Sequence, residues 1–84
     1  MDLQAGCVVK SLAGHDKGQY YILLSDEGKT VTVADGKYKT IAAPKRKNKK
    51  HIQAEKEPLP ESGPLSDERI RRELKIYRKS HSCS

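Results

Sequence analysis

The chain has 84 residues and a formal net charge of +6; 33% of its residues are charged and 35% are hydrophobic. This composition allows one small domain with a modest core, filled by four tyrosines and the aliphatic residues because Trp and Phe are absent. No apolar run approaches the roughly 18 to 20 residues that a membrane-spanning helix needs. Without a charged-then-apolar leader, we expect a soluble cytoplasmic protein in which Cys7 and Cys83 are free thiols.

The positive excess is concentrated in one short segment. Residues 1–43 balance five Lys against five acids, whereas the segment 44–51, PKRKNKKH, holds five bases and no acid. Clustered Lys and Arg neutralise phosphates and release counterions, so this run indicates a polyanionic partner. A solubilising basic tail or a localisation patch is the alternative interpretation.

Three strands are predicted within the first 34 residues. The apolar runs 7–12 and 19–24 have the length and composition of strands. In the second run, Tyr20 and Tyr21 should point to opposite faces of the sheet. The segment 29–34 alternates apolar and polar residues, which places its two valines on a buried face.

A fourth strand is predicted over residues 37–42. Asp35-Gly36 signals a two-residue hairpin turn, because both central positions of that turn favour positive φ. In the strand that follows, Tyr38 and Ile41 supply apolar contacts. A fifth short strand is expected at 51–53. Four or five short strands joined by tight turns within ~50 residues suit a small, strongly bent antiparallel barrel.

A linker and one helix are expected after the strands. The segment 54–64 contains three of the four prolines and alternating charge, which is typical of a linker. A helix is predicted over 65–79, with Ser66 as its N-cap. Leu65 and Ile70 occupy the two positions of a hydrophobic staple.

The predicted helix is amphipathic. Two acid-first pairs lie four residues apart, Asp67 with Arg71 and Glu68 with Arg72. Its apolar residues form one narrow stripe, Ile70, Leu74 and Tyr77. At about thirteen residues the helix is marginal alone, so it should be ordered where this stripe packs, either on the barrel or on a partner protein. Residues 80–84 are expected to form a disordered tail.

The glycines and apolar residues of the opening stretch follow a recognisable pattern: Gly6, Val9, Gly14, Lys17, Gly18 and then the run 20–24. This pattern resembles the KOW motif, an RNA- and protein-binding element of several ribosomal proteins and of NusG-type transcription factors. The following TVTVADGK is similar to the segment after the motif in KOW-class large-subunit ribosomal proteins of archaea and eukaryotes. The whole chain is similar to small bacterial KOW-domain RNA-binding proteins, and the match extends through about residue 53.

The resemblance implies an SH3-like barrel in which the loop from Gly14 to Gly18 contacts RNA. Two residues depart from the family pattern. Ser11 stands where the family has a buried apolar residue, which leaves the core thinner. Tyr21 stands where many transcription-factor KOW motifs have another glycine, which points to the ribosomal branch.

Within the Gly14–Gly18 loop, Lys17 is the first candidate for a phosphate contact, beside glycine N–H groups; the alternative is a solvated turn lysine. His15 is a candidate for stacking on a base or a ribose, although a lone loop histidine is more often simply exposed. Asp16 complicates this picture, because a carboxylate repels phosphate unless it orients Lys17 or caps the turn.

Further lysines are expected to form one basic surface beside the loop if barrel closure brings them together. The full set of predicted RNA-binding residues is Lys10, Gly14, His15, Lys17, Gly18, Lys37, Lys39, Lys45, Arg46, Lys47, Lys49 and Lys50.

Metal-binding and catalytic signals are absent from the sequence. No Cys or His residues show the spacing of structural zinc sites, and there is neither a nucleophile elbow nor a phosphate-binding glycine signature. We therefore expect no metal, no cofactor and no enzymatic activity.

The favoured hypothesis is a monomeric RNA-binding protein that grips structured RNA, ribosomal RNA in particular, by its phosphates as a ribosome- or translation-associated factor. The alternative is a protein-interaction module that docks on the transcription or translation machinery through the stripe Ile70, Leu74 and Tyr77.

Overall fold

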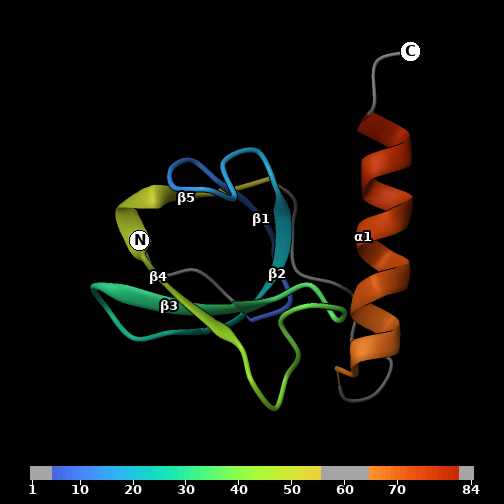
Figure 1. Cartoon of the computed structure of the whole chain (residues 1–84), viewed down its shortest axis with the longest axis horizontal. Coiled ribbons are helices and arrows are strands. Elements are labelled where there is room, and N and C mark those ends of the chain that lie inside the picture. The colour runs from blue at the N-terminus through green and yellow to red at the C-terminus, as the bar shows by residue number, and fades with distance from the viewer. Residues whose placement is uncertain (1–4, 56–64, 82–84) are drawn as a thin grey trace.

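The computed structural model describes residues 5–55 and 65–81, which form one five-stranded antiparallel sheet and one α-helix (Figure 1). The helix α1 is Asp67–His81, and a 3-10 turn, η1, is Lys49–His51. The strands are β1 (Val8–Ser11), β2 (Tyr20–Asp26), β3 (Thr30–Ala34), β4 (Lys45–Asn48) and β5 (Ile52–Ala54). The expected fold class, a mainly β antiparallel domain followed by a C-terminal helix, is confirmed.

The sheet is strongly bent. Its strand order is β4-β3-β2-β1-β5, so β4 and β5 are its two edges. These two edges are joined by η1 alone, which has three residues. Such a short connection brings the edges together only if the sheet curls around its own inner face, as the barrel-like arrangement in Figure 1 shows.

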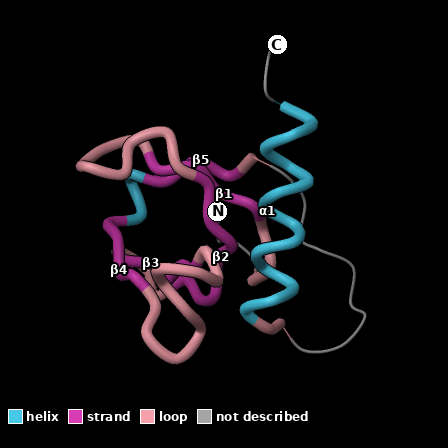
Figure 2. The backbone as a smooth tube through the Cα atoms, turned by 45° about the vertical axis from the view of Figure 1, so that its right-hand side comes forward, coloured by secondary structure: helices cyan, strands magenta, loops and turns pink. Residues whose placement is uncertain are grey.

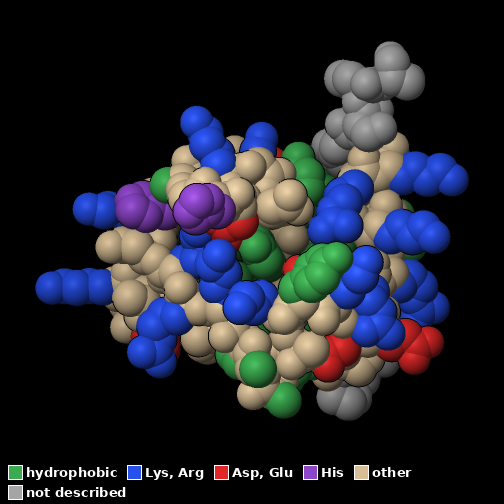
Figure 3. All heavy atoms as spheres, viewed as in Figure 1, with side chains coloured by type: hydrophobic (Ala, Val, Ile, Leu, Met, Phe, Trp, Pro, Cys, Tyr) green, Lys and Arg blue, Asp and Glu red, His purple; other side chains and the backbone are tan. Residues whose placement is uncertain are grey.

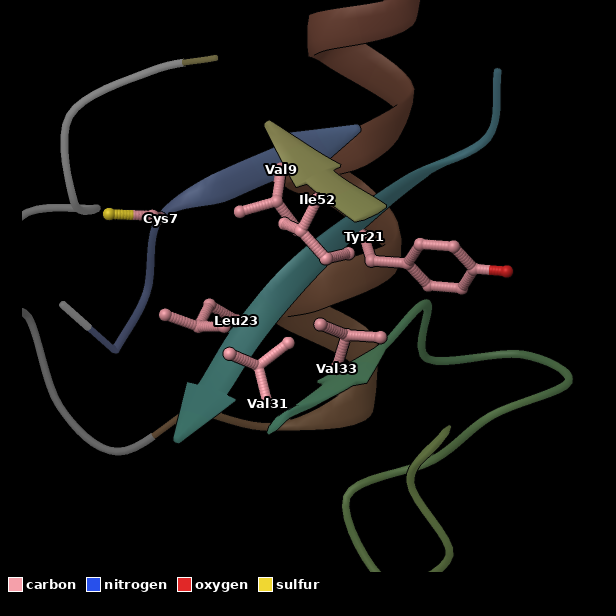
Figure 4. Close-up of a cluster of buried hydrophobic side chains, with 7 residues drawn as sticks. All are labelled: Cys7, Val9, Tyr21, Leu23, Val31, Val33 and Ile52. Carbon is pink, nitrogen blue, oxygen red and sulfur yellow. The ribbon is translucent and has the colours of Figure 1, made fainter. Parts of the chain in front are cut away.

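The inner face of the sheet holds the barrel core (Figure 4). Val31 and Val33 are fully buried in it, as the alternation of β3 predicts. Every strand except β4 contributes to this core, together with the residue that precedes β1. Its members are Cys7, Val9, Tyr21, Leu23, Val31, Val33 and Ile52.

The outer face of β1, β2 and β3 is covered by α1, which lies alongside the sheet in Figure 2. Val8, Ile22 and Ala34 from the sheet pack there against the helix stripe of Ile70, Leu74 and Tyr77. Because both faces are buried, consecutive residues of these strands are apolar: Val8 and Val9 in β1, and residues 20–24 in β2.

The two adjacent tyrosines of β2 take opposite faces, as predicted. Tyr21 lies in the barrel core, while Tyr20 packs against α1. The rings of Tyr20 and Tyr77 meet edge to face, with their centroids 5.0 Å apart. The apolar stripe of the helix is therefore packed on the barrel, the first of the two arrangements expected for it.

The helix begins as predicted but ends later. The Ser66 Oγ accepts a hydrogen bond from the Arg69 N–H at 3.2 Å, which confirms the N-cap. The helix continues to His81, so the expectation of a tail from residue 80 is wrong for residues 80 and 81, and 82–84 lie outside the described residues. Most of the predicted linker, 56–64, also lies outside them, and Ala54 belongs to β5.

The predicted strand at 37–42 is wrong, because residues 35–44 form an irregular loop and the fourth strand is β4. Tyr38 is 77% exposed and Ile41 is 37% exposed, so neither joins the core. A tight hairpin turn at Asp35-Gly36 needs positive φ at both positions. Only Gly36 has positive φ, 79°, and the turn therefore does not form.

No helix in the described part of the chain is both long enough and apolar enough to span a membrane.

Candidate functional site

The basic segment that the sequence analysis singled out forms β4 and η1, and most of its charges are paired. Lys47 is only 9% exposed, and its Nζ lies 2.9 Å from the Asp16 Oδ1. The Lys45 Nζ lies 3.0 Å from the other oxygen of the same carboxylate. The structure thus places both lysines against the carboxylate of the Gly14–Gly18 loop, with Lys47 buried away from solvent.

Asp16 is held by four donors at the end of the barrel core. Besides the two lysines, the Tyr21 hydroxyl donates to Asp16 Oδ2 at 2.8 Å, and its ring extends out of the core cluster in Figure 4. The Ser11 hydroxyl lies 3.1 Å from Asp16 Oδ1. Ser11 is fully buried, so a polar residue at this position is satisfied by hydrogen bonds and does not face an apolar core.

The electrostatic consequence is clear for both partners of the Asp16–Tyr21 hydrogen bond. Desolvation by burial acts to raise the pKa of Asp16, but the hydrogen bonds from its four neighbours outweigh it and hold that pKa well below its ordinary value. Burial, followed by the hydrogen bond to Asp16, raises the pKa of Tyr21. Asp16 is therefore a charged residue whose carboxylate joins several neighbours within the fold. It does not orient Lys17, which is one of the roles that the sequence left open.

Two further bases of the segment have acidic partners from the β2–β3 turn. The Lys49 Nζ lies 2.6 Å from the Asp26 Oδ2, and the Arg46 Nη2 lies 3.7 Å from the Glu27 Oε2. Lys50 alone of the five bases forms no ion pair with an acid in the described residues. The segment therefore offers far less unpaired charge than its sequence indicates.

The Gly14–Gly18 loop is closed by its own hydrogen bonds. The Lys17 N–H donates to the Gly14 carbonyl at 3.2 Å, and the Gly18 N–H donates to the Ser11 carbonyl at 2.8 Å. These two donors are consequently not directed at a ligand. His15 and Lys17 are exposed, which leaves their side chains as the groups this loop presents to solvent.

A second surface has the geometry of a binding site: a recess of about 300 Å³ between α1 and the 35–44 loop. Four cationic side chains line it, together with Gln19, Asp35, Tyr38 and Leu74. Gln19 directly follows the Gly14–Gly18 loop, so that loop reaches the edge of the recess. The four cations are Lys37, Arg71, Lys75 and Arg78.

The loop side of the recess is fixed by Asp35 and by the helix. The Asp35 Oδ1 accepts hydrogen bonds from three successive N–H groups, those of residues 37–39, each at 2.9 Å. Gly36 is buried against the first turn of α1, where an added Cβ would clash with the Asp67 carbonyl oxygen. Arg71 donates to the Gly36 carbonyl, and the Ile41 N–H donates to Asp67 Oδ1 at 2.8 Å.

These contacts replace the predicted ion pairs of the helix. In the described residues, neither Asp67 with Arg71 nor Glu68 with Arg72 forms an ion pair. Asp67 and Arg71 instead turn to the 35–44 loop, where each satisfies a backbone group that the irregular loop leaves unpaired.

The helix side of the recess carries cations that lie outside the predicted set of RNA-binding residues. Arg71, Lys75 and Arg78 are spaced i, i+4 and i+7, so they form one stripe directly beside the buried apolar stripe. Figure 3 shows Lys and Arg side chains gathered along α1 and across the middle of the same face. The signal was present in the sequence as this spacing.

The remaining predicted residues lie around the barrel. Of the predicted set, Lys37 lines the recess, while the exposed Lys39 lies two positions further along the same loop. The Lys10 Nζ lies 6.0 Å from the centre of the Tyr20 ring. A shallower hollow near the β2–β3 turn is lined by Lys29, Lys49 and Lys50, together with Gly28 and Asn48.

Among the residues described, no three His, Cys, Asp or Glu side chains lie close enough together to hold a metal ion. The chain matches no protein-family model, and no curated protein matches it significantly. The resemblance to the KOW motif therefore depends on the glycine and apolar residues quoted above.

Proposed function

We propose that this protein binds RNA through the recess between α1 and the 35–44 loop, with cationic side chains contacting phosphates. The observation that carries the proposal is the convergence of Lys37, Arg71, Lys75 and Arg78 on one recess. None of the four forms an ion pair with an acid in residues 5–55 and 65–81. Unpaired cations gathered on one face are the usual electrostatic footprint of nucleic-acid binding.

The single acid of the recess does not oppose this assignment. The Asp35 carboxylate already accepts three backbone hydrogen bonds, which offset part of its negative charge. Arg71 uses one N–H on the Gly36 carbonyl, and a guanidinium has four more. The recess therefore keeps a positive character toward an incoming phosphate.

Pairing within the fold also moves the positive excess away from the basic segment 44–51. Acids of residues 16–27 neutralise most of the β4 segment, whereas residues 67–81 hold six bases and three acids. The choice of RNA among polyanions is supported by the KOW-like glycine pattern, and ribosomal RNA is the target that the ribosomal branch of that resemblance favours. A ribosome- or translation-associated role follows from the same proposal.

The test compares two double variants with equal loss of charge. Lys75→Gln with Arg78→Gln removes two recess cations, while Arg72→Gln with Lys79→Gln removes two exposed cations outside the recess. Binding of fluorescein-labelled ribosomal RNA fragments is followed by anisotropy over a salt series. The recess variant should lower the log-log salt slope by about 1.4 to 1.8, at roughly 0.7 to 0.9 per lost phosphate contact, and the control should change it less.

Equal losses of RNA affinity in the two variants would mean that the recess cations act only through the net charge of the protein. Wild-type binding that does not depend on salt would contradict phosphate contact altogether. The alternative function is protein interaction through the helix stripe. This stripe is buried against the sheet, so it does not favour that alternative. Protein partners recovered from lysate after nuclease treatment would restore that alternative.

A further inference from the structure

Tyr38 is an exposed aromatic side chain at the edge of the cationic recess. It is 77% exposed, whereas Tyr21 and Tyr77 are buried and Tyr20 is half-buried. Its backbone N–H is bonded to Asp35, but its ring belongs to neither hydrophobic cluster. An exposed ring makes few apolar contacts within the fold and is open to contact by a ligand.

The backbone that carries this ring is held on both sides. Before Tyr38, Gly36 is buried against the first turn of α1 and its carbonyl accepts from Arg71. At Tyr38 itself and its two neighbours, the Asp35 carboxylate fixes three successive N–H groups. After it, the Ile41 N–H is bonded to Asp67. Such a loop needs little further ordering when a ligand binds, and this favours affinity.

One side of the ring is already occupied by charge. The Lys37 Nζ lies 5.1 Å from the centroid of the Tyr38 ring, within the range of a cation–π contact. A flat π-system can stack on the remaining face, while Lys37 and the helix cations contact the phosphates beside it. A nucleobase joined to phosphates has this combination, and its face is accessible only when the base is unpaired.

We infer that Tyr38 is a stacking platform for an unpaired base, so that the recess selects single-stranded or looped-out RNA over continuous duplex. This inference rests on the proposed function, because it names the class of RNA that the same recess takes. The cations supply attraction to any RNA backbone, and Tyr38 supplies the preference between the two forms.

The test uses the full chain and one labelled RNA strand of about 12 nucleotides, free and annealed to its complement. Tyr38→Ala should weaken binding of the free strand about tenfold, the loss typical of one base–aromatic stack, and leave duplex binding unchanged. Tyr38→Phe should bind like the wild type, because the ring is kept. Ile41→Ala is the matched control, since it trims another exposed apolar side chain of the same loop.

A second measurement reports stacking directly. The chain contains no Trp, so Tyr38→Trp introduces a single indole at the platform. Its fluorescence should be quenched by the free strand, and much less by the duplex. The melting temperature of each variant shows that the fold is intact.

The outcomes separate the two proposals. If Tyr38→Ala behaves like Ile41→Ala while the Lys75/Arg78 variant still loses affinity, the stacking platform is wrong and phosphate binding by the recess stands. If Tyr38→Ala weakens both RNA forms equally, the preference for unpaired bases is wrong. If the wild type binds neither form, both proposals fail.

Discussion

Lys47 and Asp16 are 31 positions apart in sequence, yet the Lys47 Nζ lies 2.9 Å from the Asp16 carboxylate, and both side chains are almost excluded from water. The pair joins β4 to the loop between β1 and β2. It therefore fastens an edge strand that contributes no residue to the barrel core. A charged pair in this position acts on the stability of the fold more than on ligand binding.

Asp16→Asn should lower the free energy of unfolding by about 3 kcal/mol, because it leaves the buried Lys47 ammonium without a countercharge. Urea unfolding followed by circular dichroism measures this change. The matched control is Glu27→Gln, which removes the exposed partner of Arg46 and should cost less than about 1 kcal/mol. Similar costs for the two variants would show that the Asp16 carboxylate contributes no more to stability than an exposed ion pair does.

The same carboxylate should govern the acid limb of stability. Burial alone would raise the pKa of Asp16, but its hydrogen bonds lower it below the ordinary value of 3.8. The stabilisation is therefore present above that ordinary value and is lost as the pH falls through the lowered folded-state pKa. Urea midpoints measured across acidic pH should fall more steeply for the wild type than for Asp16→Asn. Parallel curves would contradict this assignment.

Gly36→Ala should uncouple the 35–44 loop from α1. The substitution adds strain at positive φ and a clash with the Asp67 carbonyl, which together cost about 3 kcal/mol. Gly18→Ala is the matched control, because Gly18 also has positive φ but nothing lies within 4 Å of an added Cβ, so about 1 kcal/mol is expected. Urea midpoints for the two variants measure the two costs. Equal losses of stability would mean that glycine is needed at position 36 only for its positive φ.

Leu74→Ala should cost about 3 kcal/mol, since it opens a cavity between α1 and the outer face of the sheet. Ile76→Ala, on the same helix but 52% exposed, should change stability by less than about 0.5 kcal/mol. Helical circular dichroism during thermal unfolding provides the measurement. If Leu74→Ala were as mild as the control, the stripe would not be packed on the barrel.

Much of the fold can be predicted from the sequence, because a strand or helix with one buried face has apolar residues at a regular spacing. The valines of β3 alternate, and the N-cap at Ser66 marks the start of α1. β4 has no such apolar spacing. Its sequence is KRKN, and its one buried side chain, Lys47, is held by an ion pair with Asp16. Conversely, Tyr38 and Ile41 resemble strand residues, but the contacts of Asp35 and Gly36 hold them in a loop.

The candidate site was harder to predict than the fold, for an electrostatic reason. Net charge counted along the chain treats residues 1–43 as balanced and 44–51 as unopposed. Folding brings Asp16, Asp26 and Glu27 onto the basic segment. The net charge counted from the sequence is therefore correct, but most of the unpaired positive charge lies outside the basic segment. Arg71, Lys75 and Arg78 are separated along the chain by other residues, so a count of net charge along the sequence does not show them as one cationic stripe.

The burial of both faces of β1 and β2 has a consequence for how the molecule comes apart. Val8 and Val9 are neighbours in the chain, yet one packs against α1 and the other lies inside the barrel. Loss of the helix would expose an apolar face on the very strands that hold the barrel core. We therefore expect helix and barrel to unfold in a single cooperative transition, with neither half an independent folding unit.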